Sequence, residues 1–147
     1  MRITKRTNIA ARLLMYCATH DDRLVTKAEV AEVCNVSENH LAQVINQLSQ
    51  AGYLTTQRGR KGGIMLGRAA AEIGIGDVFR HVEGPVPIVE CFADADNTCP
   101  LVSACRLRDA LQRAADAFYS ALDGVTLDSL VCDNTDLARI FCTPNCR

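Results

Sequence analysis

Apolar residues in the first part of the chain recur at the spacing that places them on one face of a helix. Over residues 7–20, Ile9, Leu13, Leu14 and Cys17 share such a face, and polar residues cover the opposite one. An amphipathic helix of this kind is stable when its apolar face packs against other elements. The pattern therefore predicts a first helix that is part of a hydrophobic core.

Two shorter helical segments follow, with a tight turn between them. Thr26 and Glu29 form a capping box, the signature of a helix start, and this helix ends near Val33. Ser37 is a favourable N-cap for the next helix, which ends at Gly52, a residue that easily adopts the left-handed conformation found after helices. Two helices joined by a tight turn are typical of a helix-turn-helix.

The pattern then changes to that of a β-hairpin. Residues 53–56 and 64–66 have the composition of short strands, and residues 57–63 between them form a basic, glycine-rich loop. A hairpin in this position is the wing of a winged helix. The predicted fold is therefore mainly α with a small β-hairpin, and it begins with a winged helix-turn-helix.

The second half of the chain combines helices with an irregular loop. A helix over residues 75–82 is followed by Pro85 and Pro87, which prevent its continuation. A long helix is predicted over residues 104–122, and Thr126 begins a last short helix. The long helix carries an apolar stripe that consists of Leu107, Leu111, Ala115, Phe118 and Leu122.

These patterns divide the chain into three parts. Residues 1–70 form the winged helix-turn-helix, and residues 71–135 contain the irregular loop and the later helices. Residues 136–147 are expected to be a mobile tail, because terminal segments are poorly ordered unless they pack against the domain.

Charge is distributed unevenly along the chain. The net charge is −1, which by itself does not favour a nucleic-acid partner. However, residues 1–68 carry ten Lys and Arg against five Asp and Glu, whereas residues 69–147 carry six against twelve. A basic first half and an acidic second half indicate a DNA-binding part and a separate sensing or assembly part.

Several classes of function are disfavoured. The chain lacks a phosphate-binding loop, a dinucleotide fingerprint, H-E-x-x-H and G-x-S-x-G, so we expect neither an enzyme nor a small-molecule substrate. With 5% aromatic residues, stacking on single-stranded nucleic acid is also disfavoured. We expect a cytoplasmic protein without a membrane partner, because no signal-peptide cleavage pattern and no apolar segment of about 20 residues is found.

The second helix of a helix-turn-helix enters the major groove of DNA with its N-terminal residues. Asn39 and Gln43 could each form two hydrogen bonds with an adenine edge, and Ser37 could contact a base or a phosphate. The basic residues of the wing suit phosphates or a narrow minor groove. The residues predicted to bind double-stranded DNA are Thr26, Ser37, Asn39, His40, Gln43, Arg58, Arg60 and Lys61. The alternative is that the polar helix residues only form a solvated face.

Three cysteines of the irregular loop form a candidate metal site. Cys91, Cys99 and Cys105 have the spacing C-x7-C-x5-C, and thiolates are the usual ligands of iron–sulfur clusters. Three cysteines leave one iron to another ligand. Zinc is an alternative because acidic residues flank the cysteines, although structural zinc sites usually contain closer cysteine pairs. Free thiols and a disulfide switch are further alternatives.

The other five of the eight cysteines are assigned more ordinary roles. Cys17, Cys34 and Cys132 are expected to be small buried hydrophobic residues. Cys142 and Cys146 in the tail could bind a metal or form a disulfide, but more often such a terminal pair has no function.

From Met1 to about residue 131, the chain resembles the Rrf2 family of bacterial winged-helix regulators. The resemblance rests on the start MRITKRTNIAARLLMYCA, on VSENHLAQVINQLSQAGYL, on the wing RGRKGGIMLG, on IGIGDVFRHVEG and on CFADADNTCPLVSACRL. It implies a homodimer that pairs through the long helix over residues 104–122. It also implies an iron–sulfur cluster on Cys91, Cys99 and Cys105, of the [4Fe–4S] type with [2Fe–2S] as a degradation form.

Members of this family differ in the fourth ligand of the cluster. In IscR-like members it is a His three residues after the last cysteine, where this chain has Arg108. In NsrR-like members it is an Asp on the first helix, where this chain has Asn8. A neutral amide is a poor cluster ligand, so Asn8 marks only a region in which the fourth ligand is expected.

Asn8 and the cysteine spacing are most similar to the iron-responsive RirA branch of the family. This similarity implies a repressor of iron homeostasis whose cluster-loaded dimer binds operator DNA and releases it when iron is scarce or oxygen is high. The alternatives are a nitric-oxide-sensing repressor of NsrR type and a cluster-free thiol-switch regulator. An iron–sulfur carrier or redox enzyme would not require contacts with DNA.

Overall fold

The structure is a computed structural model that describes residues 3–84, 89–93 and 97–142. Pro85, Pro87 and Cys146, named above, lie outside these residues, as do the acidic residues 94 and 96 beside the cysteines. In chain order the elements are α1 (Lys5–Thr19), α2 (Lys27–Val33), α3 (Glu38–Gln50), β1 (Leu54–Gln57), β2 (Gly63–Leu66), η1 (Ala70–Glu72), α4 (Ile75–Glu83), η2 (Glu90–Phe92), η3 (Val102–Ala104), α5 (Arg106–Asp123), α6 (Leu127–Val131) and α7 (Thr135–Phe141).

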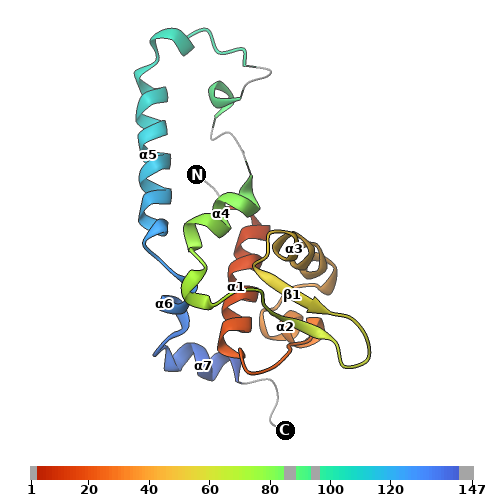
Figure 1. The fold of residues 1–147 in the computed structure, drawn as a ribbon. Helices are drawn as coiled ribbons and strands as arrows, with labels where there is room; N and C mark the ends of the chain where they lie inside the picture. The colour runs from red at the N-terminus through yellow and green to blue at the C-terminus, as the bar shows by residue number, and fades with distance from the viewer. Residues whose placement is uncertain (1–2, 85–88, 94–96, 143–147) are drawn as a thin grey trace.

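Two regions can be distinguished in Figure 1. The body consists of α1 to α4, the hairpin, α6 and α7, with α1 near its centre. The arm consists of η2, η3 and α5, and it extends away from the body beyond α4. In the described part of the chain, none of the helices is both long and apolar enough to cross a membrane.

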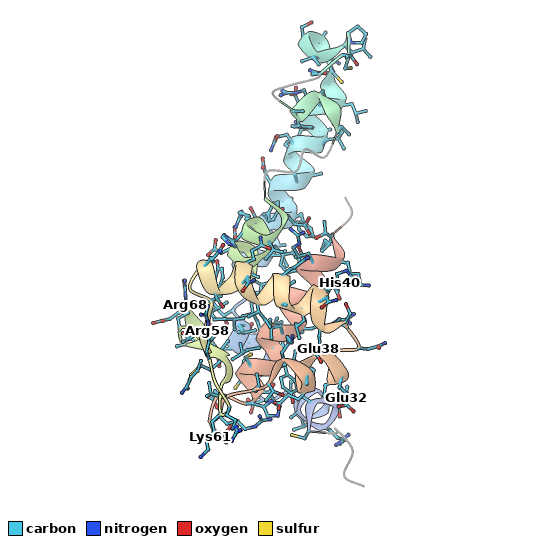
Figure 2. The ribbon with its side chains drawn as sticks, turned by 90° about the vertical axis from the view of Figure 1, so that its right-hand side faces the viewer. Glu32, Glu38, His40, Arg58, Lys61 and Arg68 are labelled. Carbon is cyan, nitrogen blue, oxygen red and sulfur yellow. The ribbon has the colours of Figure 1, made fainter. Side chains whose placement is uncertain are left out.

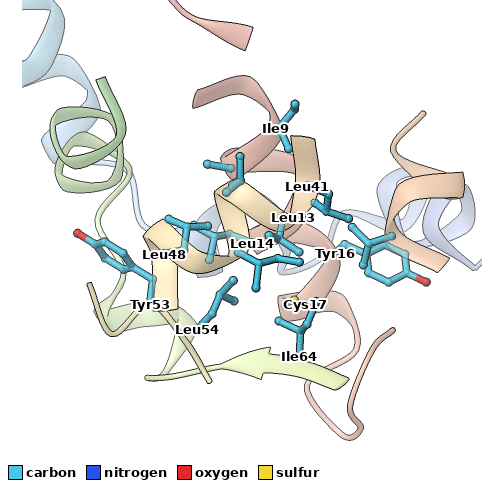
Figure 3. Packing of buried hydrophobic residues seen from close by; sticks show 14 of the residues in the cluster. Ile9, Leu13, Leu14, Tyr16, Cys17, Leu41, Leu48, Tyr53, Leu54 and Ile64 are labelled. Carbon is cyan, nitrogen blue, oxygen red and sulfur yellow. The ribbon is translucent and has the colours of Figure 1, made fainter. Parts of the chain in front are cut away.

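The predicted first helix is confirmed as α1, and its apolar face is the centre of the core. Leu13 and Leu14 are fully buried, and Ile9 and Cys17 expose 3% and 1% of their surfaces (Figure 3). These residues pack against α3, α4, α6 and β2. Burial of one such leucine contributes about 1.5–3 kcal/mol, so tertiary packing is the main stabilisation of α1.

The helix-turn-helix is also confirmed. The Thr26 Oγ1 accepts a hydrogen bond from the Glu29 backbone amide at 3.2 Å, and the Thr26 hydroxyl donates to the Glu29 carboxylate at 3.1 Å. Asn35 makes the turn with φ of 51°, a conformation that Asn tolerates better than most residues. Ser37 then caps α3, which buries Leu41, Val44, Ile45 and Leu48 on its inner side.

The wing is an antiparallel pair in which Leu54 faces Leu66 and Gln57 faces Gly63. An isolated bridge between Val25 and Ile64 attaches the hairpin to the chain before α2. A Cβ at Gly62 would lie 2.1 Å from the Gln57 carbonyl oxygen, so the turn of the wing requires glycine at this position. Together with the helix-turn-helix, the hairpin completes the predicted winged helix.

The junction between α4 and α5 joins the arm to the body. The Arg80 guanidinium donates two hydrogen bonds to the Asp123 carboxylate, at 2.5 and 2.7 Å, and lies 4.8 Å from the ring centre of Tyr119. At Gly76, an added Cβ would lie 2.1 Å from Asp123 Oδ1. A larger residue at this position would therefore have to displace the Asp123 carboxylate, which Arg80 holds with two hydrogen bonds.

One part of the predicted tail has a different structure. Residues 135–141 form α7, which begins where Asn134 Oδ1 accepts a hydrogen bond from the Leu137 amide at 3.1 Å. Phe141 exposes only 6% of its surface and packs edge-on against Tyr16 of α1. For residues 136–141 the structure therefore differs from the predicted mobile tail, because one aromatic side chain attaches the helix to the core. The bounds of the other helices differ from the predicted ones by a few residues.

Candidate DNA-binding face and cysteine-bearing arm

The outer side of α3 presents most of the polar residues predicted to contact DNA. Ser37, Asn39, His40 and Gln43 are all exposed, while the apolar residues of α3 face the core. The Ser37 hydroxyl and His40 Nδ1 lie 2.9 Å apart and are hydrogen-bonded, with the donor set by the histidine tautomer. This bond fixes the histidine ring at the start of α3.

The three basic residues of the wing are exposed as well. Figure 2 shows α3 lying across the molecule with His40 at one end, while Arg58 and Lys61 lie on the hairpin. Among the described residues, no acidic side chain lies within 4 Å of the charged groups of Arg58, Arg60 or Lys61. The structure thus leaves these three charges available to an anionic partner.

Thr26 differs from the other predicted DNA-binding residues. Its hydroxyl is occupied in the cap of α2, where it both accepts from and donates to Glu29. A contact with DNA would have to compete with these hydrogen bonds, so a role of Thr26 in DNA binding stays a prediction.

Two charged residues near this face are not among the predicted DNA-binding residues. Glu38 forms an ion pair of 3.0 Å with Lys27, which connects the first turns of α3 and α2. Arg68 donates hydrogen bonds to the carbonyls of Ala51 and Gly52, at 2.9 and 3.3 Å, and covers the Tyr53 ring. Arg68 therefore satisfies free carbonyls at the end of α3, and because it follows the hairpin in the chain, no local pattern records this contact.

The three cysteines of the candidate cluster site lie in the arm, and all are free, partly exposed thiols. Cys91 belongs to η2, Cys99 follows a turn in which its amide donates to Asn97 Oδ1 at 3.1 Å, and Cys105 is the N-cap residue of α5. Within the described residues, no three Cys, His, Asp or Glu side chains lie close enough together to hold a metal. The structure therefore places the cysteines in one segment without bringing their sulfur atoms together.

Arg108 connects the first and last of these cysteines. Its Nε donates a hydrogen bond of 3.2 Å to the Cys91 carbonyl, and its guanidinium lies 5.1 Å from the Phe92 ring centre. Since Arg108 is in the first turn of α5, it holds η2 beside the helix that begins after Cys105. The donor chemistry fits an iron–sulfur cluster, because soft thiolates are its preferred ligands and all three thiols are free.

The fourth-ligand region is not defined by the single chain. Asn8 lies on the exposed side of α1, in the body. Arg108 is engaged with Cys91 and Phe92, and a guanidinium has no lone pair to offer a metal. Neither residue supplies a suitable donor.

The remaining described cysteines differ in burial. Cys17 and Cys34 are buried as predicted, and burial, with a smaller contribution from the neighbouring Cys34, raises the pKa of Cys17 to about 12. Cys132, predicted to be buried, is exposed, because it follows the short helix α6 and faces solvent. The nearby charges of Asp133 and Asp128 raise its pKa, which disfavours the thiolate.

The sequence is similar to those of known transcriptional regulators. Residues 3–133 match the model of the Rrf2 family, described as an iron-dependent transcriptional regulator. The chain is 44% identical over 131 residues to Protein aau3 of Rhizobium meliloti (strain 1021), which covers 89% of this chain and 85% of that protein.

Two solved structures have the same architecture. The oxidised form of CymR from Staphylococcus aureus is 28% identical, with a TM-score of 0.72, and the match covers 90% of this chain and 97% of that one. IscR from T. potens is 22% identical, with a TM-score of 0.73, covering 90% and 88%. At this identity the likeness to IscR extends to the fold alone, and it confirms the winged-helix architecture.

Proposed function

The chain belongs to the Rrf2 family of DNA-binding transcriptional regulators, and from that premise we propose that it is an iron–sulfur cluster-dependent repressor that responds to iron availability and oxygen. The observation that carries the proposal is the placement of Cys91, Cys99 and Cys105 as free thiols in one segment between α4 and the first turn of α5. Members of this family are regulators, not enzymes.

In this proposal α3 and the wing bind operator DNA. Asn39 and Gln43 contact base edges in the major groove, where an amide side chain can pair with adenine at two positions. Arg58, Arg60 and Lys61 contact the phosphate backbone or the minor groove beside it. The exposure of these side chains and the charge of the wing support this assignment.

Cys91, Cys99 and Cys105 would hold the cluster as thiolates. When bound, the cluster would contain iron that is weakly held and is lost when iron is scarce or oxygen is high. The fraction of the protein that carries the cluster would therefore report the iron level. The chain's own contribution is to present the three thiols, to hold η2 beside α5 through Arg108 and to leave this segment accessible.

The last turn of α4 offers a route from this segment to the DNA-binding face. The Gln47 side chain of α3 donates hydrogen bonds to the carbonyls of His81 and Val82, at 3.2 and 3.5 Å. Glu83 accepts hydrogen bonds from Thr4 and Thr7 of α1. The cysteine segment follows this turn in the chain, and we propose that a change in that segment acts on α3 and α1 through these hydrogen bonds.

We propose that a second copy of the chain pairs through α5. The apolar stripe of α5 is only partly covered by its own chain: Ala115 is buried, but Leu107 exposes 65% of its surface. A stripe that is covered by its own chain at Ala115 and exposed at Leu107 favours burial against a partner helix. A dimer would also present two α3 helices to the two halves of an operator.

Anaerobic purification tests the cluster and its role together. We would record absorbance, iron content and affinity for a duplex selected from a randomised DNA pool, while a chelator removes iron. The wild type is expected to be brown and to lose both its cluster and its DNA affinity. Cys99→Ser should lack both from the start, and Cys132→Ser, which removes an exposed thiol outside the arm, should match the wild type.

Other outcomes would replace the proposal. If the cluster survives the chelator and only nitric oxide releases the DNA, the protein senses nitric oxide instead.

A thiol switch is the second candidate, because the three arm thiols are free and partly exposed and a relative has been solved in an oxidised form. In this case the purified protein is colourless, binds DNA regardless of iron, and changes its affinity when the thiols are oxidised. The Cys99→Ser variant would then bind DNA but no longer respond to oxidants.

A further inference from the structure

A pocket between the start of α1 and the DNA-binding helix is not used by the contacts proposed so far. We propose that it is an additional phosphate-binding site for the DNA backbone, in which Lys5 and Arg6 hold a phosphate beside the bases that α3 contacts. This inference rests on the proposed DNA-binding function and adds the first turn of α1 to the interface.

The pocket has a volume of about 230 Å³ and is lined by Lys5, Arg6, Ile9, His40, Gln43 and Val44. Ile9 and Val44 are almost fully buried and form an apolar base, while Lys5, Arg6, His40 and Gln43 are exposed. Its open side is therefore surrounded by polar and basic side chains from two helices. None of the described residues that line it is acidic.

Position makes DNA the expected ligand. His40 and Gln43 line the pocket and also belong to the surface of α3 that is proposed to enter the major groove. The phosphates of DNA line the edges of the major groove. A duplex whose bases contact His40 and Gln43 would therefore have its phosphate backbone next to Lys5 and Arg6.

The charges of Lys5 and Arg6 are not explained by the stability of α1. The positive end of a helix dipole is at its N-terminus, so basic residues in the first turn oppose it. The first turn of α1 contains no acidic residue, and no ion pair within 4 Å connects Lys5 or Arg6 to the described acidic side chains. An unfavourable placement of two charges beside a DNA-binding helix favours a role in binding.

Glu83 is the acidic residue whose charge interacts with Arg6. Its carboxylate accepts hydrogen bonds from the Thr4 amide, at 2.8 Å, and from the hydroxyls of Thr4 and Thr7. These bonds keep the carboxylate at the cap of α1, and it is not among the residues that line the pocket. Arg6 therefore keeps its guanidinium available to a phosphate.

The experiment compares Lys5→Gln, Arg6→Gln and the double variant with Arg139→Gln, which removes one positive charge at the far end of α1, on α7. Affinity for the selected duplex and for a scrambled duplex is measured over a range of salt concentrations. Each phosphate contact contributes about 0.9 to the slope of log affinity against log salt. The double variant should lower that slope by about 1.8 and weaken binding to both duplexes on the order of tenfold.

The controls separate binding from folding. Arg139→Gln should keep the wild-type slope. The double variant should unfold at nearly the wild-type temperature, because the loss of two charges that oppose the helix dipole offsets the loss of the Arg6 charge near Glu83. The inference is overturned if the double variant keeps the wild-type slope. If binding is then lost when Arg58, Arg60 and Lys61 are replaced together, the proposed function stands without it. If both sets of variants bind like the wild type, the proposed DNA-binding surface is wrong as well. A loss restricted to the selected duplex would show that Lys5 and Arg6 position α3 and hold no phosphate.

Discussion

The body and the arm of this molecule are both helical, but they differ in how much of their apolar surface is buried within the chain. In the body, α1 and α3 bury apolar faces against each other, and Leu13, Leu14, Leu41 and Leu48 are fully buried. In the arm, α5 is the longest helix described, yet Ala115 is its one buried residue.

The difference indicates where stability and where regulation are located. A region with a complete core of its own has one well-defined structure. In the arm, an apolar stripe that is only partly covered lies next to a segment of free thiols, and the proposed dimer and the proposed cluster would complete this region. We therefore expect variants in the body to change folding, and variants in the arm to change assembly and sensing.

Replacement of one leucine in each region gives the largest contrast. Leu14→Ala removes a fully buried side chain and should lower the free energy of unfolding by about 2–5 kcal/mol. Leu107→Ala removes a side chain that is 65% exposed and should change the free energy of unfolding of the single chain by less than about 0.5 kcal/mol. Urea unfolding at low protein concentration measures both. Equal losses would mean that the arm is part of the same core.

The next variant tests the arm as an assembly surface. Leu107→Glu places a charge on the exposed end of the apolar stripe of α5 and should raise the dissociation constant of the proposed dimer by about a hundredfold, as expected when an unpaired charge is buried in an interface. Sedimentation equilibrium measures this constant. Ile140→Glu on α7, where the side chain is 60% exposed, is the matched control and should leave the dimer intact. If Ile140→Glu is the variant that dissociates the dimer, the interface lies on the body.

The helices that the sequence predicted are those whose burial follows from a local pattern. The apolar spacing of Ile9, Leu13 and Leu14 predicted α1 because helical periodicity and burial agree in the body. The helix α7 was missed, since its attachment depends on Phe141 reaching Tyr16, a contact between distant parts of the chain that no local pattern records.

The sequence predicted only those parts of the candidate site that are local features of the chain. Motif spacing identified the arm cysteines and the exposed residues of α3, both of which are local features. It did not identify Lys5 and Arg6, because their relation to α3 exists only after α1 has packed against it. Among the described residues the three arm cysteines do not come together, so their convergence on a cluster stays a prediction.

A smaller effect is expected at the junction of the two regions. Gly76→Ala should lower the free energy of unfolding by about 1–3 kcal/mol, because the new Cβ would lie 2.1 Å from Asp123 Oδ1 and 3.1 Å from the Asp123 backbone nitrogen. Gly124→Ala is the control, since nothing lies within 4 Å of its added Cβ. Thermal unfolding should show a loss for the first variant and little change for the second. A neutral Gly76→Ala would mean that α5 is free to move away from α4.

The smallest effect concerns Glu83, the last residue of α4 before the arm. Partial burial would raise the pKa of its carboxyl, but hydrogen bonds from Thr7 and Thr4 and the charge of Arg6 outweigh burial, so its pKa lies below the ordinary value. A carboxyl with a lowered pKa stabilises the folded state above its unfolded pKa of about 4.3, and this stabilisation is lost as the pH falls through the folded pKa.

Glu83→Gln keeps a hydrogen-bond acceptor and removes the charge, so at neutral pH it should cost less than about 1 kcal/mol of unfolding free energy, since the site is only partly shielded from solvent. The difference from the wild type should shrink as the pH falls through the lowered folded pKa of Glu83, because the wild-type carboxyl then becomes neutral as well. Urea unfolding at a series of pH values measures it, and Glu72→Gln in η1, whose side chain is exposed, serves as the control. A cost that stays constant down to acid pH would mean that Glu83 acts by shape and hydrogen bonding alone. In that case α4 would be attached to α1 without an electrostatic contribution, and the link between arm and body would not depend on charge.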